Sequence, residues 1–378
     1  MSNILLVLLF VIISIELSIA FVIYPLKNGL NFYKLVSGGR FKVFKYDKIL
    51  GYDWNTNLNY KNPTTPLKNA PRKIQWVDIK TDKYGFLTKR NIDQVKKKSK
   101  LIFCIGGSTT AGGESRHDLS YPNILSSLIE PLGYTVINAG VGGYRSIHEL
   151  LLLKKKILKH KPYAVIIFSG YNDFEDAAWN LSNPFNPHTH CLSQNLPNNY
   201  IEVFLQRSAI YFASKRFFYF LRKKIRSENI PKFSIRNFKK VLKNPLFLDE
   251  WSSNMSALIE ECKKNNIKVY MLSHASPCFK DASKKEKNFA DVDLNMQGLF
   301  DIFLKYIDLI EERTKYLCKS LNVNYLDINK SFNLPYKERY SMFVDRMHFS
   351  EKGNKLLAKA IFLELISDLK KNHYKENI

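Results

Sequence analysis

The sequence predicts an α/β protein in which a parallel sheet is covered by helices on both faces. From Leu101 onward, short apolar runs alternate with longer amphipathic stretches, which is the rhythm of repeated strand–helix–strand units. The apolar runs are almost uninterrupted, as they are in parallel strands that are buried on both sides. Polar and glycine-rich segments follow these runs, at the edge where ligands bind in such sheets.

The predicted elements follow one another in a regular order. Pro122 suits the first turn of one helix, apolar residues repeat on one face of the next, and Ser350 suits the cap of the last. The predicted strands are residues 101–105, 134–138, 163–169, 267–273 and 323–328, and the predicted helices are residues 121–132, 146–160, 248–265, 299–321 and a final helix after residue 350. Residues 274–296 are expected to form a polar loop.

Residues 174–247 break this alternation with prolines and with aromatic and basic clusters, and we interpret them as an insertion or lid. The predicted organisation is a membrane anchor over residues 1–25, an N-terminal extension over 26–95 that packs on the catalytic domain, and that domain over 96–370. The chain contains no internal repeat.

The net charge is +24, with 58 Lys and Arg against 34 Asp and Glu. Such a field attracts anionic partners such as lipid headgroups, acidic polymers or nucleic acid. The lysines are spread along the chain, however, and no nucleic-acid motif accompanies them. We therefore interpret them as solvated helix faces and expect no nucleic-acid partner. The five cysteines form no CxxC pair, and their odd number argues against a disulfide framework.

Residues 4–23 are almost continuously apolar. About 20 such residues span a bilayer as a helix, so we predict an uncleaved transmembrane anchor. A cleaved signal peptide is the alternative, but no Lys or Arg precedes the apolar run. The basic residues that follow it favour a cytoplasmic catalytic domain, although that rule weakens when a long domain follows.

Two glycine-containing loops follow the first two predicted strands. In the first, Gly106 and Gly107 precede Ser108, and such a turn can expose the Ser hydroxyl and bring backbone N–H groups near a reacting carbonyl. The second contains Gly143 and ends at a helix N-terminus, where N–H groups stabilise negative charge. Each loop alone is more often structural, and the first is not the GxSxG elbow.

Two further segments bring polar side chains to the same edge. Asn172 follows the third strand and offers an amide donor, although a lone Asn there is usually a turn residue. Asp345 and His348 precede the last helix, and their spacing lets the carboxylate bond one ring nitrogen and leave the other free to act as a base.

In this order, the four segments resemble the SGNH (GDSL-type) hydrolase family. The resemblance covers about residues 100–175 and 340–368. It implies a flavodoxin-like three-layer α/β/α sandwich and ester hydrolysis without a metal or other cofactor. It also implies the roles of single residues: Ser108 as the nucleophile, His348 as the base oriented by Asp345, and an oxyanion hole formed by Ser108, Gly143 and Asn172.

The chain departs from the family motif on both sides of the serine. The family has Asp before it and Leu after it, where this chain has Gly107 and Thr109. The Gly-Gly-Ser-Thr form is similar to a membrane-anchored branch that is linked to envelope polysaccharides. The departure leaves the implied triad intact, but it argues against a simple lipase.

Aromatic residues surround the predicted oxyanion donor Asn172. Tyr171, Phe174 and Trp179 are predicted to form the wall of a sugar or acyl pocket, and the alternative is that they anchor the insertion to the core. The histidines have no metal-ligand spacing, so we expect no metal; those considered are His117, His148, His188 and His190.

The sequence thus predicts a serine esterase that removes acyl groups, acetyl above all, from a carbohydrate or envelope glycan. Two alternatives stay open: an O-acyltransferase that uses the same residues, and a membrane-anchored glycan-binding or assembly protein without turnover. The expected partners are an acyl ester or acylated glycan and, through the N-terminal helix, a membrane. We expect an extracytoplasmic catalytic domain, with the cytoplasmic side as the alternative.

Overall fold

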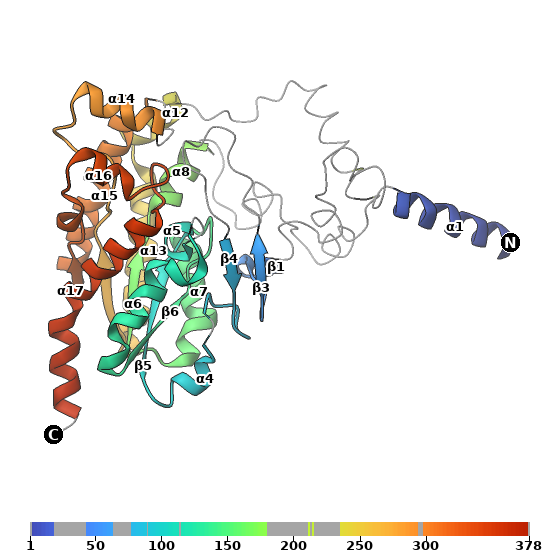
Figure 1. Cartoon of the computed structure of the whole chain (residues 1–378), viewed down its shortest axis with the longest axis horizontal. Helices are drawn as coiled ribbons and strands as arrows, with labels where there is room; N and C mark the ends of the chain where they lie inside the picture. The colour runs from blue at the N-terminus through green and yellow to red at the C-terminus, as the bar shows by residue number, and fades with distance from the viewer. Residues whose placement is uncertain are drawn as a thin grey trace. The chain divides into compact units, whose positions relative to one another are not determined.

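The computed structural model describes most of the chain after residue 76 and shorter parts before it (Figure 1). The described residues are 2–18, 43–62, 77–88, 90–112, 115–179, 211, 214, 235–293 and 298–376. The chain divides into two compact units, one formed by residues 1–55 with 183–232 and the other by residues 56–182 with 233–378.

In the first unit, the structure describes an apolar helix, α1 (Ser2–Ser18), and an antiparallel hairpin of β1 (Phe44–Asp47) and β2 (Gly51–Trp54). The predicted transmembrane helix over residues 4–23 is not found. The described part of this helix has 17 residues, and residues 19–23 lie outside the described part. No helix among the described residues is long and apolar enough to cross a membrane.

The second unit is built on a five-stranded parallel sheet with the strand order β6-β5-β7-β8-β9. Its strands are β5 (Lys100–Gly106), β6 (Tyr134–Asn138), β7 (Ala164–Phe168), β8 (Lys268–Leu272) and β9 (Asn324–Leu326). Every residue of β6 and β7 is buried, so both faces of the sheet are covered. The predicted α/β class with a parallel sheet is therefore confirmed.

The helices that cover the sheet form two packed groups (Figure 1). One consists of α6 (Tyr121–Ile129) and α17 (Glu351–Glu376). The other surrounds α13 (Leu246–Lys264) and contains α7 (Ser146–Leu152), α8 (Tyr171–Trp179), α12 (Ile235–Lys243) and α15 (Phe300–Ser320). Shorter helical segments are α4 (Ile92–Val95), α5 (Ser108–Ala111), η3 (His117–Leu119), η4 (Glu130–Leu132), η7 (Asn329–Phe332) and α16 (Tyr336–Ser341).

The loop predicted over residues 274–296 is wrong in part, because it contains the helix α14 (Lys284–Asp293). The Ser283 N–H donates to a Glu286 carboxylate oxygen at 2.6 Å, and the Glu286 N–H donates to Ser283 Oγ at 3.3 Å. This reciprocal capping box starts a helix even in a polar segment.

Two other segments differ from the prediction in detail. The predicted helix over 146–160 is α7 followed by a π turn, η5 (Leu153–Ile157), and a 3₁₀ turn, η6 (Leu158–His160). The predicted insertion begins inside α8, so the helix that carries Asn172 continues past residue 174. Most of the insertion lies outside the described residues.

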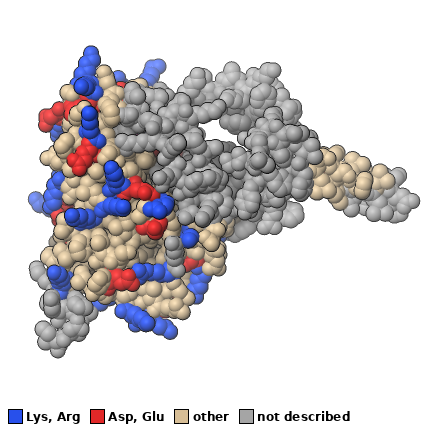
Figure 2. Space-filling view, viewed as in Figure 1, with Lys and Arg blue, Asp and Glu red and all other residues tan. Residues whose placement is uncertain are grey.

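Part of the N-terminal extension packs on the sheet. This part contains an antiparallel hairpin of β3 (Asn59–Asn62) and β4 (Val77–Lys80), and the residues after β4 reach the sheet. The Leu87 N–H donates to the carbonyl of Asn138 at 2.9 Å, and the rings of Phe86 and Phe103 lie 5.2 Å apart. On the described part of the face in Figure 2, basic side chains are interspersed with acidic ones.

Candidate active site

Ser108 lies where β5 ends and the short helix α5 begins. Gly107 precedes it as the N-cap residue, and the Ser108 side chain is half-buried. The first N–H groups of a helix have no partner within that helix, so the backbone amide of Ser108 is oriented to bind an acceptor at this edge of the sheet.

The hydroxyl of Ser108 is bonded to His348, a residue 240 positions later in the chain. Ser108 Oγ and His348 Nε2 are 2.8 Å apart, and His348 Nδ1 lies 2.7 Å from Asp345 Oδ2. The other carboxylate oxygen of Asp345 accepts the backbone N–H groups of Met347 (2.9 Å) and His348 (2.8 Å). The local turn therefore fixes the carboxylate, and the carboxylate fixes the imidazole.

Asp345 is held in its ionised form. Burial raises the pKa of this carboxyl, but the charge of His348, its hydrogen bond and the charge of Arg346 lower it by more, so the pKa lies well below its usual range. An ionised carboxylate at Nδ1 keeps the proton on that nitrogen. The lone pair of Nε2 then faces the hydroxyl of Ser108, as a general base requires.

The glycine-rich loop after β6 lies beside the serine. The Val141 N–H donates to the carbonyl of Gly106 at 3.0 Å, which ties the two loops together. A Cβ at Gly142 would lie 3.9 Å from Ser108 Cβ. Gly143 has a φ of 82°, in the region that favours glycine, and its N–H has no acceptor among the described residues.

Asn172 is the third predicted oxyanion donor, and it lies over Gly107. Its Nδ2 donates to the carbonyl of Tyr144 at 2.7 Å, which leaves its second amide hydrogen for another acceptor. A Cβ at Gly107 would come within 2.4 Å of Asn172 Nδ2. The glycine at position 107, where the family has Asp, therefore leaves room for the Asn172 amide beside the residue that precedes Ser108, a reason that the sequence did not reveal.

Asp173 joins the second and third loops. Its carboxylate accepts the backbone N–H of Ser146, at 3.1 Å from the nearer oxygen, and the hydroxyl of the same serine at 2.6 Å. Burial raises the pKa of Asp173 to about 6, although Arg145 and Ser146 act in the opposite direction. This buried carboxylate holds the start of α7 against the helix that carries Asn172.

The residues 102–361 match the model of the GDSL-like lipase/acylhydrolase family. This chain belongs to that family. It is a hydrolase that acts on ester bonds. No curated protein matches the chain.

Solved structures give distant matches. The chain is similar to an acetyl xylan esterase (16% identity, 70% of this chain and 98% of that chain, TM-score 0.40) and to an acetylxylan esterase from Geobacillus stearothermophilus (17% identity, 71% and 94%, TM-score 0.42). It is also similar to a GDSL-like lipase from Bacteroides thetaiotaomicron (14% identity, 73% and 90%, TM-score 0.39). The family assignment rests on the family model alone.

The predicted aromatic wall does not form as expected. Phe174 is fully buried, and its ring stacks on that of Tyr306 at 4.4 Å. Tyr171 is 5% exposed and donates its hydroxyl to the carbonyl of Ala275 at 2.9 Å. Both rings belong to the core, as the alternative interpretation requires, and the side chain of Trp179 lies outside the described part.

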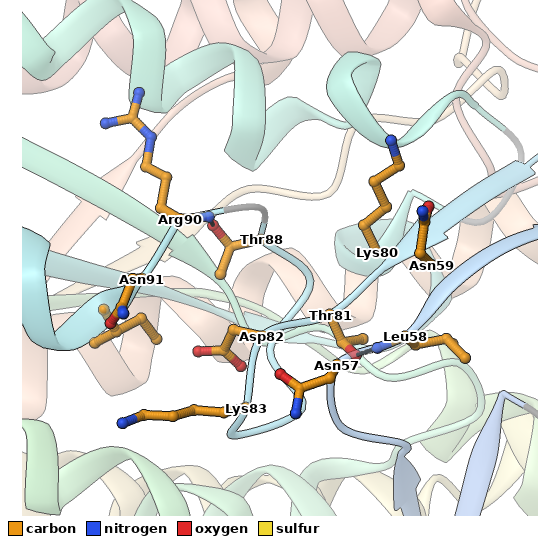
Figure 3. A pocket seen from close by; sticks show the side chains of 11 residues that line it. Asn57, Leu58, Asn59, Lys80, Thr81, Asp82, Lys83, Thr88, Arg90 and Asn91 are labelled. Carbon is orange, nitrogen blue, oxygen red and sulfur yellow. Dashed lines mark hydrogen bonds between the residues drawn. The ribbon is translucent and has the colours of Figure 1, made fainter.

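A polar pocket of about 420 Å³ lies in the extension of this acylhydrolase, away from its predicted site residues (Figure 3). Two of the cations that line it, Lys83 and Arg90, form ion pairs with Asp93 and Glu130. None of its lining residues belongs to the predicted site. Within the described residues, no three His, Cys, Asp or Glu side chains gather as metal ligands. His117 and His148 are buried, and His188 and His190 lie outside those residues.

Proposed function

We propose that this protein is an O-acyl esterase, acting on acetyl esters of a carbohydrate, in which Ser108 is the nucleophile. One observation carries the proposal: an unbroken chain of short hydrogen bonds runs from Ser108 Oγ through the His348 ring to Asp345, at 2.8 and 2.7 Å. Nucleophile, base and orienting carboxylate in this arrangement are the requirement for acyl transfer to a serine.

In the proposed reaction, His348 Nε2 removes the proton of Ser108 as Oγ attacks the ester carbonyl. The tetrahedral intermediate collapses when the protonated imidazole gives that proton to the departing alcohol oxygen, and an acyl-serine remains. Water then enters, loses a proton to the same nitrogen and attacks the acyl carbon. The acid leaves, and the proton returns to Ser108 Oγ. Asp345 stabilises the imidazolium in both halves and keeps its own charge.

The negative charge that develops on the carbonyl oxygen needs donors at the same edge. We propose the backbone N–H groups of Ser108 and Gly143 and the free amide hydrogen of Asn172. Each such donor lowers the barrier by about 3 kcal/mol, or roughly 10²–10³ in rate. The position of Asn172 supports this role, because a Cβ at Gly107 would come within 2.4 Å of its Nδ2, so the amide lies beside the residue that precedes the proposed nucleophile.

The carbohydrate part of the proposal is supported by the sequence around the serine. Gly107 and Thr109 stand where a simple lipase of the family has Asp and Leu, and the Gly-Gly-Ser-Thr form is similar to the polysaccharide-linked branch. The membrane anchor and the extracytoplasmic location stay predictions from the sequence.

The nucleophile is tested by a fluorophosphonate label and by turnover of p-nitrophenyl acetate. We expect Ser108→Ala to abolish both, while Ser127→Ala, which changes an exposed serine on α6, leaves both intact. Circular dichroism should show the same fold for both variants. Labelling of Ser108→Ala at the wild-type rate would exclude the proposed nucleophile.

The substrate is tested separately, with acetylated oligosaccharides and long-chain p-nitrophenyl esters compared at equal concentration. The proposal predicts a higher kcat/KM on the acetylated sugars, with free acetate as the product. Acetyl transfer to an added sugar acceptor in place of acetate release would identify the acyltransferase. Labelling of Ser108 without turnover of any ester would favour the binding protein.

A further inference from the structure

One ion pair connects the two sides of the proposed site. Arg346 lies in the turn between Asp345 and His348, and its side chain reaches Glu175 on α8. Arg346 Nε donates to Glu175 Oε1 at 2.8 Å, and Nη2 donates to the same oxygen. The two residues are 171 positions apart in the chain, so the pair is a tertiary contact and not part of a local turn.

The pair is largely removed from solvent. The side chains of Arg346 and Glu175 are 22% and 20% exposed, and the guanidinium carbon lies 5.6 Å from the centre of the buried Phe303 ring. Burial lowers the pKa of Arg346, but the charges of Glu175 and Asp345 raise it by more. The guanidinium therefore stays charged. Water solvates this charge only in part, and the carboxylate of Glu175 compensates the rest.

Glu175 lies three residues after Asn172, and residues at this spacing lie on the same side of a helix. Arg346 is bonded covalently to Asp345, whose carboxylate orients the imidazole of His348. This ion pair thus links the turn that carries the proposed base to the helix that carries the proposed oxyanion donor.

We propose that Arg346 and Glu175 are positioning residues that set the distance between His348 and Asn172. This inference rests on the proposed esterase function and goes beyond the roles that the family resemblance implies. His348 and Asn172 must act on the same ester group. His348 takes the proton of Ser108 Oγ as it attacks the carbonyl carbon, and the Asn172 amide binds the oxygen of that carbonyl. A displacement of about 1 Å in such an arrangement costs roughly 10²-fold in rate.

The geometry also explains why an arginine occupies position 346. Two N–H groups of the planar guanidinium donate to one oxygen of Glu175. This fixes the direction of the Arg346 side chain as well as its distance from Glu175. A lysine at this position would keep the positive charge, but its ammonium group lacks the planar pair of N–H donors. Arg346→Lys should therefore retain only part of the positioning.

The test is a double-mutant cycle on kcat and KM for p-nitrophenyl acetate. We expect Arg346→Ala and Glu175→Ala each to lower kcat by about 10- to 100-fold while KM changes less than about twofold. The double variant should be no slower than the slower single variant, because both remove the same link. Arg346→Lys should recover part of kcat. The rate of fluorophosphonate labelling should fall in parallel.

The matched control is another Arg–Glu pair at the opposite edge of the sheet. Arg90 and Glu130 form two hydrogen bonds of 2.6 and 2.7 Å, and Glu130 lies in η4, the 3₁₀ turn that precedes β6. Arg90→Ala and Glu130→Ala should leave kcat unchanged. Glu175→Gln, which keeps the size of the side chain, replaces Glu175→Ala if that variant does not fold.

The outcomes separate this inference from the proposed function. If Ser108→Ala is inactive but the Arg346 and Glu175 variants keep wild-type kcat, the positioning role is overturned and the esterase stands. Additive losses in the double variant would also overturn it, because the two residues would then act independently. If Ser108→Ala keeps its activity, the proposed function itself fails.

Discussion

Two histidine–carboxylate pairs in this molecule look alike at one ring nitrogen and differ at the other. His348 Nδ1 lies 2.7 Å from Asp345, and His274 Nδ1 lies 3.3 Å from Glu311. The Nε2 of His348 meets the hydroxyl of Ser108 at 2.8 Å, whereas the Nε2 of His274 meets the backbone carbonyl of Ser169 at 2.6 Å.

The partner of Nε2 decides what each ring can do. A carbonyl oxygen only accepts hydrogen bonds, so Nε2 of His274 must carry a proton and has no lone pair for a substrate. A hydroxyl donates as well as accepts, so Nε2 of His348 can receive a proton from Ser108. A carboxylate beside a histidine is therefore insufficient for catalysis.

The two histidine–carboxylate pairs also differ in burial. His274 is 1% exposed, and the Tyr325 hydroxyl also donates to Glu311. Burial raises the pKa of Glu311, but the hydrogen bond and charge of His274 lower it by more. His348 keeps a side-chain exposure of 19%. The His274 pair thus joins the segment after β8 to α15, while the His348 pair meets the hydroxyl of Ser108.

The same substitution, His to Leu, should have different effects in the two pairs. His348→Leu should lower kcat for p-nitrophenyl acetate by about 10⁴–10⁶-fold with little change in the free energy of unfolding. His274→Leu should leave kcat within a few-fold but lower the free energy of unfolding by about 3 kcal/mol, since the Ser169 carbonyl loses its side-chain donor and Glu311 loses one of its donors. Steady-state kinetics and urea unfolding measure both quantities. Equal kinetic losses would contradict the division of roles.

Substitution of the two carboxylates should give a smaller difference in kcat. Asp345→Asn should lower kcat by about 10³–10⁴-fold, because an amide no longer holds the proton on Nδ1 of His348. Glu311→Gln should act on stability and leave kcat almost unchanged. The kinetic constants of the two variants, measured at one pH, check this expectation; a loss of kcat in Glu311→Gln would show that the two pairs are coupled.

Gly107→Ala tests the oxyanion side of the site and should lower kcat by about 10- to 100-fold. The added Cβ would need the space within 2.4 Å of Asn172 Nδ2, so the amide must move from the position next to Ser108. Combined with Asn172→Ala, the substitution should cause little further loss, because both remove the same donor. Full additivity in kcat would show that Gly107 has another role.

These contrasts show which parts of the site the sequence could reveal. The pair Asp345 and His348 was predictable because its geometry depends on a spacing of three residues and a local turn. Ser108 and Asn172 were predictable because loops after parallel strands meet at one edge of the sheet.

Other features depended on tertiary contacts. The link from Arg346 to Glu175 spans 171 positions, and the space that Gly107 leaves for Asn172 depends on two loops in contact. His274 was predicted to start a polar loop, and nothing local indicates that its ring is buried between Ser169 and Glu311. The capping box of Ser283 and Glu286, in contrast, is a local signal for the start of α14.

Asp173 is a buried carboxylate that accepts hydrogen bonds from the backbone N–H and the hydroxyl of Ser146 rather than from a histidine. Burial raises its pKa to about 6 from the ordinary value of 3.8, so the folded protein binds the proton more tightly than the unfolded chain does. The stability that the protonated form contributes is complete below about pH 4. It is lost as the pH rises through about 6, by roughly 3 kcal/mol at most.

Asp173→Asn does not ionise and should abolish this dependence. Relative to wild type, the variant should therefore gain about 2.4 kcal/mol in free energy of unfolding between pH 4 and pH 7, whatever it loses at pH 4 from a weaker bond to Ser146. Urea unfolding at both pH values measures the difference. An unchanged difference would mean that Arg145, which lies 3.7 Å from this carboxylate, keeps Asp173 ionised as His348 keeps Asp345.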